Sequence, residues 1–125
     1  MPAIVILGTH DPDLETHAAT GEAIIHAERE LGVVLNTRWL TPERLGEPEA
    51  VLEETCGAVI APRNPKQPRE LQPDVLGALT WLRAHRVPTL AIEAGYHHMV
   101  IEFARNVPGW IPRTPPDTMR RHRPP

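Results

Sequence analysis

The sequence lacks what a disulfide-bonded or zinc-binding scaffold needs, because Cys56 is the only cysteine among its 125 residues. One thiol excludes an intramolecular disulfide framework and any zinc site built from paired cysteines. No apolar run approaches the roughly 18 residues that cross a bilayer. Residues 1–7 have neither the basic flank nor the cleavage site of a signal peptide. These absences predict a cytoplasmic protein that does not enter a membrane.

A large excess of one charge is also missing, since 13 Lys and Arg stand against 16 Asp and Glu, a net charge of −3. The chain therefore lacks the basic footprint of a nucleic-acid-binding protein, and nucleic acid is an unexpected partner. Its length suits one domain with its own core. Proline and arginine become frequent after residue 109. We expect one domain over residues 1–109 and an irregular Pro/Arg-rich tail over residues 110–125.

Apolar, β-rich runs alternate with stretches of helical periodicity along the chain. The runs predict strands over residues 3–7, 33–39, 58–61 and 89–92. The periodic stretches predict helices over residues 13–31, 43–54 (in one or two pieces), 71–85 and 95–106. This alternation is typical of an α/β fold with a parallel sheet and right-handed crossovers.

The first predicted helix has recognisable ends and an apolar face. Asp13 is a suitable N-cap, and Gly32 is a suitable residue to end the helix. The predicted buried face carries Leu14, Ala18, Ile24, Ile25 and Leu31. In parallel sheets, ligands bind and catalytic residues lie in the loops beyond the carboxyl ends of the strands. Here those places are the loops at residues 10–13, 40–41, 63–68 and 93–98.

Residues 88–109, PTLAIEAGYHHMVIEFARNVPG, resemble the elbow strand, turn and helix of the glutamine amidotransferase domain of CTP synthase. Residues 100–107 carry the most specific part of the likeness, and residues 3–8, 26–39 and 57–62 match more loosely. The resemblance implies a flavodoxin-like three-layer fold with a short parallel sheet in the order 2-1-3-4.

The departures from that family concern its glutaminase machinery. The family's elbow carries a cysteine that attacks the glutamine amide, and Glu93 stands at that position. The family's glycine-rich oxyanion loop reads Pro62-Arg63-Asn64-Pro65 here, and Pro65 has no N–H to donate. The family's catalytic His and Glu lie well beyond the elbow helix, in a region that we expect this chain to lack. We therefore expect no thiol-based glutamine hydrolysis.

Glu93 is the strongest candidate catalytic residue, because an elbow normally presents its side chain to a pocket. It could serve as base, nucleophile or ligand, or simply favour the helix N-terminus. His97, four residues later, its neighbour His98 and the loop residue His10 complete the candidate catalytic set. A metal held by His10, Glu93 and His97 or His98 is the minor alternative, so no metal or other cofactor is predicted.

Candidate ligand-binding residues are Arg63, Asn64, Asp11 and Tyr96. A guanidinium such as that of Arg63 can bind a carboxylate or phosphate through two hydrogen bonds. His17 could face the same pocket, but the first-helix pattern predicts that it is exposed to solvent.

Two functions remain open. The first is an enzyme that reuses the amidotransferase pocket for acid/base chemistry by Glu93 and histidine on a small polar or nucleotide-like metabolite. The second is a non-catalytic pseudo-amidotransferase that binds a ligand or a partner subunit. A homodimer is also expected, since the fourth strand would otherwise be an open edge.

Overall fold

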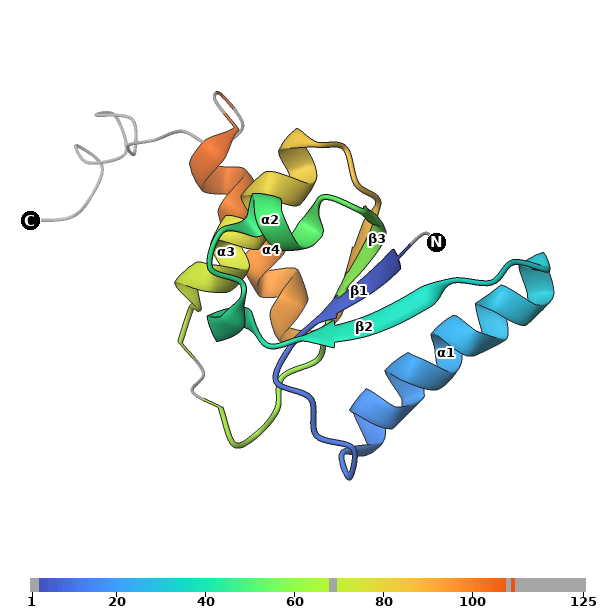
Figure 1. Ribbon diagram of the computed structural model, residues 1–125. Coiled ribbons are helices and arrows are strands. Elements are labelled where there is room, and N and C mark those ends of the chain that lie inside the picture. Colours follow the sequence, from blue (N-terminus) through green and yellow to red (C-terminus); the bar gives the residue numbers. More distant parts are fainter. Residues whose placement is uncertain (1–2, 68–69, 108, 110–125) are drawn as a thin grey trace, which may run out of the picture.

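A computed structural model describes residues 3–67, 70–107 and 109. Strand β1 (Ala3–Leu7) is followed by helix α1 (Glu15–Leu31), strand β2 (Asn36–Leu40), the 3-10 turn η1 (Pro42–Arg44) and helix α2 (Pro48–Leu52). Strand β3 (Thr55–Ile60), helix α3 (Pro73–Ala84), strand β4 (Thr89–Ala91) and helix α4 (Ala94–Asn106) complete the fold (Figure 1). The expected tail over residues 110–125 lies outside the described residues.

The strands form one parallel sheet in the order β2-β1-β3-β4, which confirms the predicted fold class and strand order. In register, Leu7 at the end of β1 lies opposite Leu40 of β2 and Ile60 of β3, and Ile60 lies opposite Ala91 of β4. All four carboxyl ends therefore meet at one edge. No helix among the described residues is long and apolar enough to span a membrane.

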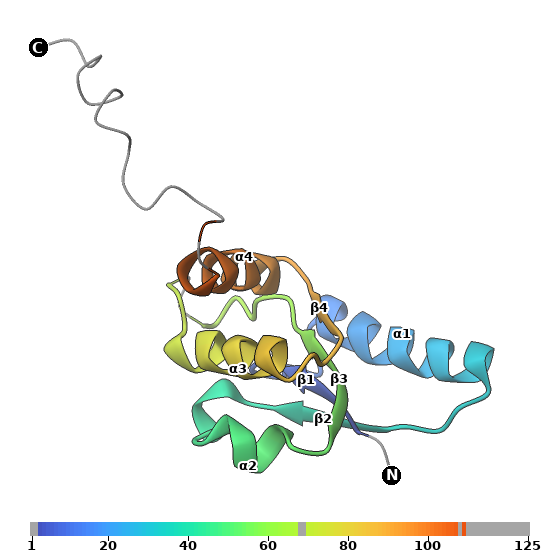
Figure 2. The same cartoon turned by 90° about the horizontal axis from the view of Figure 1, so that it is seen from above.

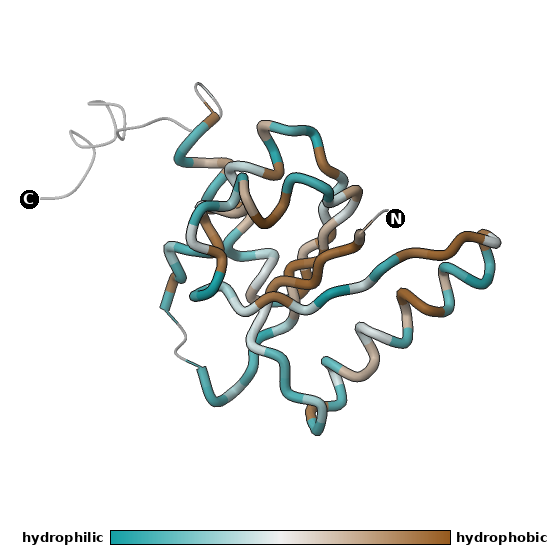
Figure 3. Tube along the Cα trace, viewed as in Figure 1, coloured by the Kyte–Doolittle hydropathy of each residue, from teal (hydrophilic) through white to brown (hydrophobic). Residues whose placement is uncertain are grey.

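Helices cover both faces of the sheet, with α2, α3 and α4 on one side and α1 on the other (Figure 2). The hydrophobic colouring is strongest along the central strands, while α1 is largely polar (Figure 3). The main core lies on the α3 side, where Val5, Leu7 and Ile60 pack against Leu79 and Leu82. A smaller cluster of Ile6, Val59 and Ala61 lies on the α1 side.

An ion pair joins helices α3 and α4. Arg83 of α3 donates through Nε to Glu102 of α4 at 2.6 Å, and the Glu102 side chain is only 3% exposed. Asn106 donates to the second oxygen of the same carboxylate at 3.2 Å. The hydrogen bond to Glu102 raises the pKa of Arg83 further, so the guanidinium stays charged. This contact joins the second half of α4 to α3.

The first helix departs from its predicted start and its predicted face. It begins at Glu15 after Leu14, without a side-chain cap, and Asp13 instead donates its N–H to the Asp11 carboxylate at 3.0 Å. Gly32 does end the helix, with φ +66°. Ala18 is exposed, and so are Ile25 and Leu31, at 49% and 74%. Ala18 and Ile25 lie about 80–100° around the helix from buried His17, and Leu31 is the last residue of the helix, so the pattern placed the buried face wrongly.

The second strand also begins later than predicted, at Asn36. Val33 and Val34 are 44% and 73% exposed in the connection from α1. Their β-branched side chains suggested a strand, but no neighbouring strand pairs with them in the described part of the chain.

Candidate functional site

The elbow at Glu93 is the most unusual backbone feature at the carboxyl edge. Glu93 has φ +54° and ψ −113°, a conformation that residues with a side chain rarely adopt. It lies between the last residue of β4, Ala91, and the first of α4, Ala94, so the chain reverses over two residues. The predicted strand, turn and helix are therefore present, with Glu93 at the turn.

Gly95 explains why the chain can turn so sharply. A Cβ on Gly95 would lie 2.7 Å from the carbonyl oxygen of Ile60 and 2.8 Å from its Cβ. The start of α4 thus contacts β3 so closely that only glycine fits. The Gly95 N–H also donates to the Ile92 carbonyl at 3.0 Å, which closes the turn.

The Glu93 carboxylate is exposed, and it bonds to the loop that follows β3. Its Oε1 accepts the backbone N–H of Arg63 at 3.1 Å. A carboxylate beside the N-terminus of α4 is also stabilised by the helix dipole. Neither Arg63 nor Asn64 has a positive φ.

Asn64 connects two of the loops at the carboxyl edge. Its buried side chain donates from Nδ2 to the Thr9 carbonyl at 3.1 Å and accepts the Lys66 N–H through Oδ1 at 3.0 Å. Lys66 also lies 3.6 Å from the Asp11 carboxylate. Asn64 and Asp11, both predicted to bind ligand, are therefore engaged in contacts within the protein.

His98 is buried at the side of the edge that faces α3. Its Nδ1 lies 2.7 Å from the Ala94 carbonyl, and its Nε2 accepts the N–H of Gln72 at 3.0 Å. An acceptor on one nitrogen and a donor on the other define a neutral imidazole with its proton on Nδ1. The Nε2 bond of this candidate catalytic residue holds the start of α3 against α4, while the Nδ1 bond lies within α4.

The prediction that His17 is exposed to solvent is wrong. His17 is 1% exposed rather than solvent-exposed, and it bridges the loops that follow β1 and β3. Its Nδ1 accepts the Asp11 N–H at 3.1 Å, and its Nε2 donates to the Pro62 carbonyl at 2.8 Å. The signal was present in its spacing, because His17 lies seven residues before the half-buried Ile24 and shares its helix face.

His10 lies on the α1 side of the sheet, away from His98. Its exposed ring stacks on Trp39 of β2, with ring centroids 4.1 Å apart and planes at 10°. His17 lies beyond, with its ring centroid 5.0 Å from that of Trp39. The β1 loop is therefore held by an aromatic stack as well as by the hydrogen bonds of His17.

Tyr96 and His97 lie on the exposed side of the first turn of α4. Their rings meet edge to face with centroids 6.0 Å apart, and the His97 N–H points at the Glu93 carbonyl at 3.3 Å. His97 is the candidate histidine nearest to Glu93 in the chain, and its ring has no hydrogen bond to another described residue.

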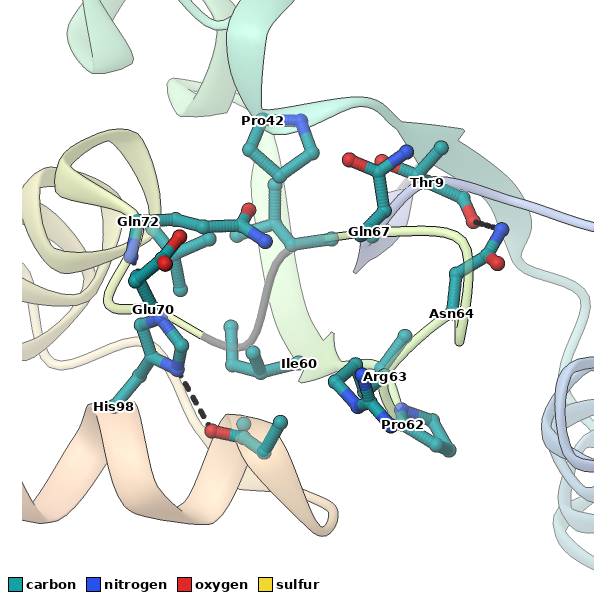
Figure 4. Close-up of a pocket in the computed structure, with 16 residues that line it drawn as sticks. Thr9, Pro42, Ile60, Pro62, Arg63, Asn64, Gln67, Glu70, Gln72 and His98 are labelled. Atoms are coloured by element: carbon teal, nitrogen blue, oxygen red, sulfur yellow. Dashed lines mark hydrogen bonds between the residues drawn. The ribbon is translucent and has the colours of Figure 1, made fainter.

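A small pocket opens at this edge, as Figure 4 shows. It has a volume of about 50 Å³, and its polar lining includes Thr9, Arg63, Asn64, Gln67, Glu70, Gln72 and His98. That volume holds about one or two waters, so the pocket is small for a metabolite. The pocket brings together Arg63, Asn64 and His98, whereas Glu93, His97, His10, Asp11 and Tyr96 do not line it. The described residues contain no group of His, Cys, Asp and Glu that could hold a metal.

A parallel sheet in the order 2-1-3-4, with a strained strand-to-helix elbow at its carboxyl edge, places the chain among flavodoxin-like α/β domains. The CTP synthase of Methanospirillum hungatei JF-1 is 34% identical over 95 residues, which cover 76% of this chain and 17% of that protein. The CTP synthase of a Nocardioides species is 59% identical over 34 residues, 27% of this chain and 6% of that protein. The sequence matches no family model.

The solved structure of the Trypanosoma brucei CTPS glutaminase domain with bound acivicin superposes with a TM-score of 0.71 at 22% identity. The match covers 88% of this chain and 43% of that one. The chain is therefore a relative of the glutamine amidotransferase-like domain of CTP synthase, as its elbow sequence suggested. It spans less than a fifth of the length of the curated relatives it matches.

Proposed function

We propose that this chain is a non-catalytic pseudo-amidotransferase, which acts by binding and does not hydrolyse glutamine. One observation carries the proposal: the elbow residue is Glu93, and its carboxylate accepts the Arg63 N–H at 3.1 Å. In the CTP synthase domains that the chain resembles, the elbow supplies a thiol and the loop after β3 supplies oxyanion-hole amides. Here the Glu93 carboxylate occupies the elbow position, and it accepts a hydrogen bond from the loop after β3.

The two buried histidines support the same proposal. A general base needs a ring nitrogen available for the proton it removes. His98 and His17 each use both ring nitrogens within the protein, so neither is available as a base. The pocket that His98 lines has a volume of only about 50 Å³, which is little room for glutamine.

Ammonia release from glutamine tests the proposal directly. We expect the wild-type chain to release ammonia no faster than buffer, and Glu93→Ala to behave identically. Release above background that Glu93→Ala abolishes would show that the elbow carboxylate catalyses hydrolysis and would refute the proposal. Folding of both proteins is checked by circular dichroism.

One observation favours the second function, an acid/base enzyme. Glu93 keeps a backbone conformation that costs about 1–3 kcal/mol, and such strain clusters at functional sites. In this alternative Glu93 is the general base and His97 the proton partner, acting on a small polar or nucleotide-like metabolite. Turnover of any member of a panel of nucleotides and amino acids by wild type, but not by Glu93→Gln, would support it. The same result would contradict the non-catalytic proposal.

A further inference from the structure

Strand β4 presents an unpaired edge in the described part of the chain. On its inner side, the Ala58 N–H donates to the Pro88 carbonyl at 2.9 Å, and the Ile92 N–H donates to the Ile60 carbonyl at 3.0 Å. Alternate residues of a parallel strand bond to opposite sides. Thr89 and Ala91 therefore direct their N–H and C=O groups outward, where none of the described strands lies.

The centre of this edge is apolar on the α1 side. Leu90 lies opposite Val59, which belongs to the core cluster on that side, yet Leu90 is 61% exposed. It borders a groove of about 440 Å³, whose other apolar walls include Ile4, Ile24, Ala27 and Leu35. A large apolar side chain at the middle of an open edge strand is a feature that soluble proteins normally cover.

The same edge is apolar on the α4 side. Met99 and Phe103 of α4 line a cavity of about 260 Å³ with Val87 and Thr89, so this side of the helix faces β4. Tyr96 and Val100 lie within about 60° of Phe103 around the helix. They are 59% and 36% exposed. The apolar strip on α4 thus continues past the strand edge.

We propose that this edge binds a second copy of the chain through antiparallel pairing of β4 with β4 about a two-fold axis. Centred on Leu90, the axis places Thr89 opposite Ala91 of the partner, so their outward N–H and C=O groups bond reciprocally. Leu90 meets Leu90 of the partner as the close, non-hydrogen-bonded pair. The Tyr96 and Val100 strips of both copies fall on the same face of the joined sheet.

Charge complementarity favours a second copy over an unrelated strand. Arg86 lies at the amino end of β4 and Glu93 just beyond its carboxyl end, and both are exposed. Antiparallel pairing brings the two ends together, so Glu93 lies beside Arg86 of the partner twice in the dimer. The partner would thereby add a cation to the elbow. The pairing does not depend on whether glutamine is hydrolysed, so it can fail or succeed independently of the proposed function.

A charge-swap experiment on the full chain tests the pairing. Light scattering should give twice the chain mass of 14.0 kDa for wild type at tens of micromolar. Leu90→Lys and Leu90→Glu should each be monomeric, because like charges would meet at the axis. An equimolar mixture of the two should regain the dimer mass. Val34→Lys, at a position 73% exposed outside the edge, is the matched control and should stay dimeric.

Each other outcome contradicts the proposal. A monomeric wild type would mean that residues 110–125, another protein or solvent covers the edge. Dimers that persist in both Leu90 variants would place the interface elsewhere. Monomeric variants whose mixture stays monomeric would exclude the symmetric contact between the two Leu90 side chains.

Discussion

The two faces of the sheet are stabilised by different means. On the α3 side, ten buried apolar residues form one cluster, and α3 alone contributes Val75, Ala78, Leu79 and Leu82. On the α1 side the buried cluster has three residues, all from the sheet and the residue after β3. The only buried residues of α1 are His17 and Thr20. The α3 face is stabilised by apolar burial. The α1 face is stabilised by the two hydrogen bonds of His17 near the carboxyl edge, which we call the polar bridge.

The largest expected difference between the two faces is in the free energy of unfolding that is lost when a sheet-facing helix residue is truncated to alanine. Leu79→Ala on α3 removes a side chain that is 3% exposed, and should lower the free energy of unfolding by about 3 kcal/mol. Ile24→Ala on α1 removes a half-buried side chain and should cost about 1 kcal/mol. Urea denaturation of both variants measures the difference. Equal losses would show that α1 is packed as tightly as α3.

Sequence reasoning found the α3 side more accurately than the α1 side, and the packing explains why. The apolar spacing of Leu71, Val75, Leu79 and Leu82 is matched by real burial from Val75 onward, so periodicity alone places the helix. On α1 the apolar residues Ile25 and Leu31 are exposed, and polar His17 is buried instead. A hydrophobicity pattern cannot recognise a helix face whose contacts are hydrogen bonds.

The candidate site was predicted in part. The elbow was found because its strand, turn and helix are local in sequence and because its segment resembles a known family. The engagement of His98 by Gln72 and of Glu93 by Arg63 could not be found, since these contacts join residues 26 and 30 positions apart. His97 and His98 point in different directions because successive helix residues are about 100° apart. His10 lies on the opposite side of the sheet, where it stacks on Trp39.

The polar bridge on the α1 side gives the next prediction. His17→Ala leaves the Asp11 N–H and the Pro62 carbonyl without their bonding partner, and should destabilise the fold by about 2 kcal/mol. His26→Ala, on an exposed position of the same helix, is the matched control and should change stability by less than about 0.5 kcal/mol. Thermal unfolding followed by circular dichroism compares them. Equal midpoints would mean that the α1 side does not depend on the His17 bridge.

The smallest expected effect is the stability gained by replacing a helix glycine with alanine on each face. This gain depends on helix propensity and not on packing. Gly21 in α1 and Gly77 in α3 are both interior helix positions, and a Cβ at either would meet nothing within 4 Å. Alanine should therefore raise stability by about 0.5–1 kcal/mol at each, because the gain comes from reduced backbone freedom in the unfolded chain. Equal gains in urea denaturation would leave apolar burial as the difference between the faces. A clearly larger gain for Gly21→Ala would mean that the new methyl group finds contacts on the α1 side, and that this side is closed more tightly than the exposed Ile25 and Leu31 indicate.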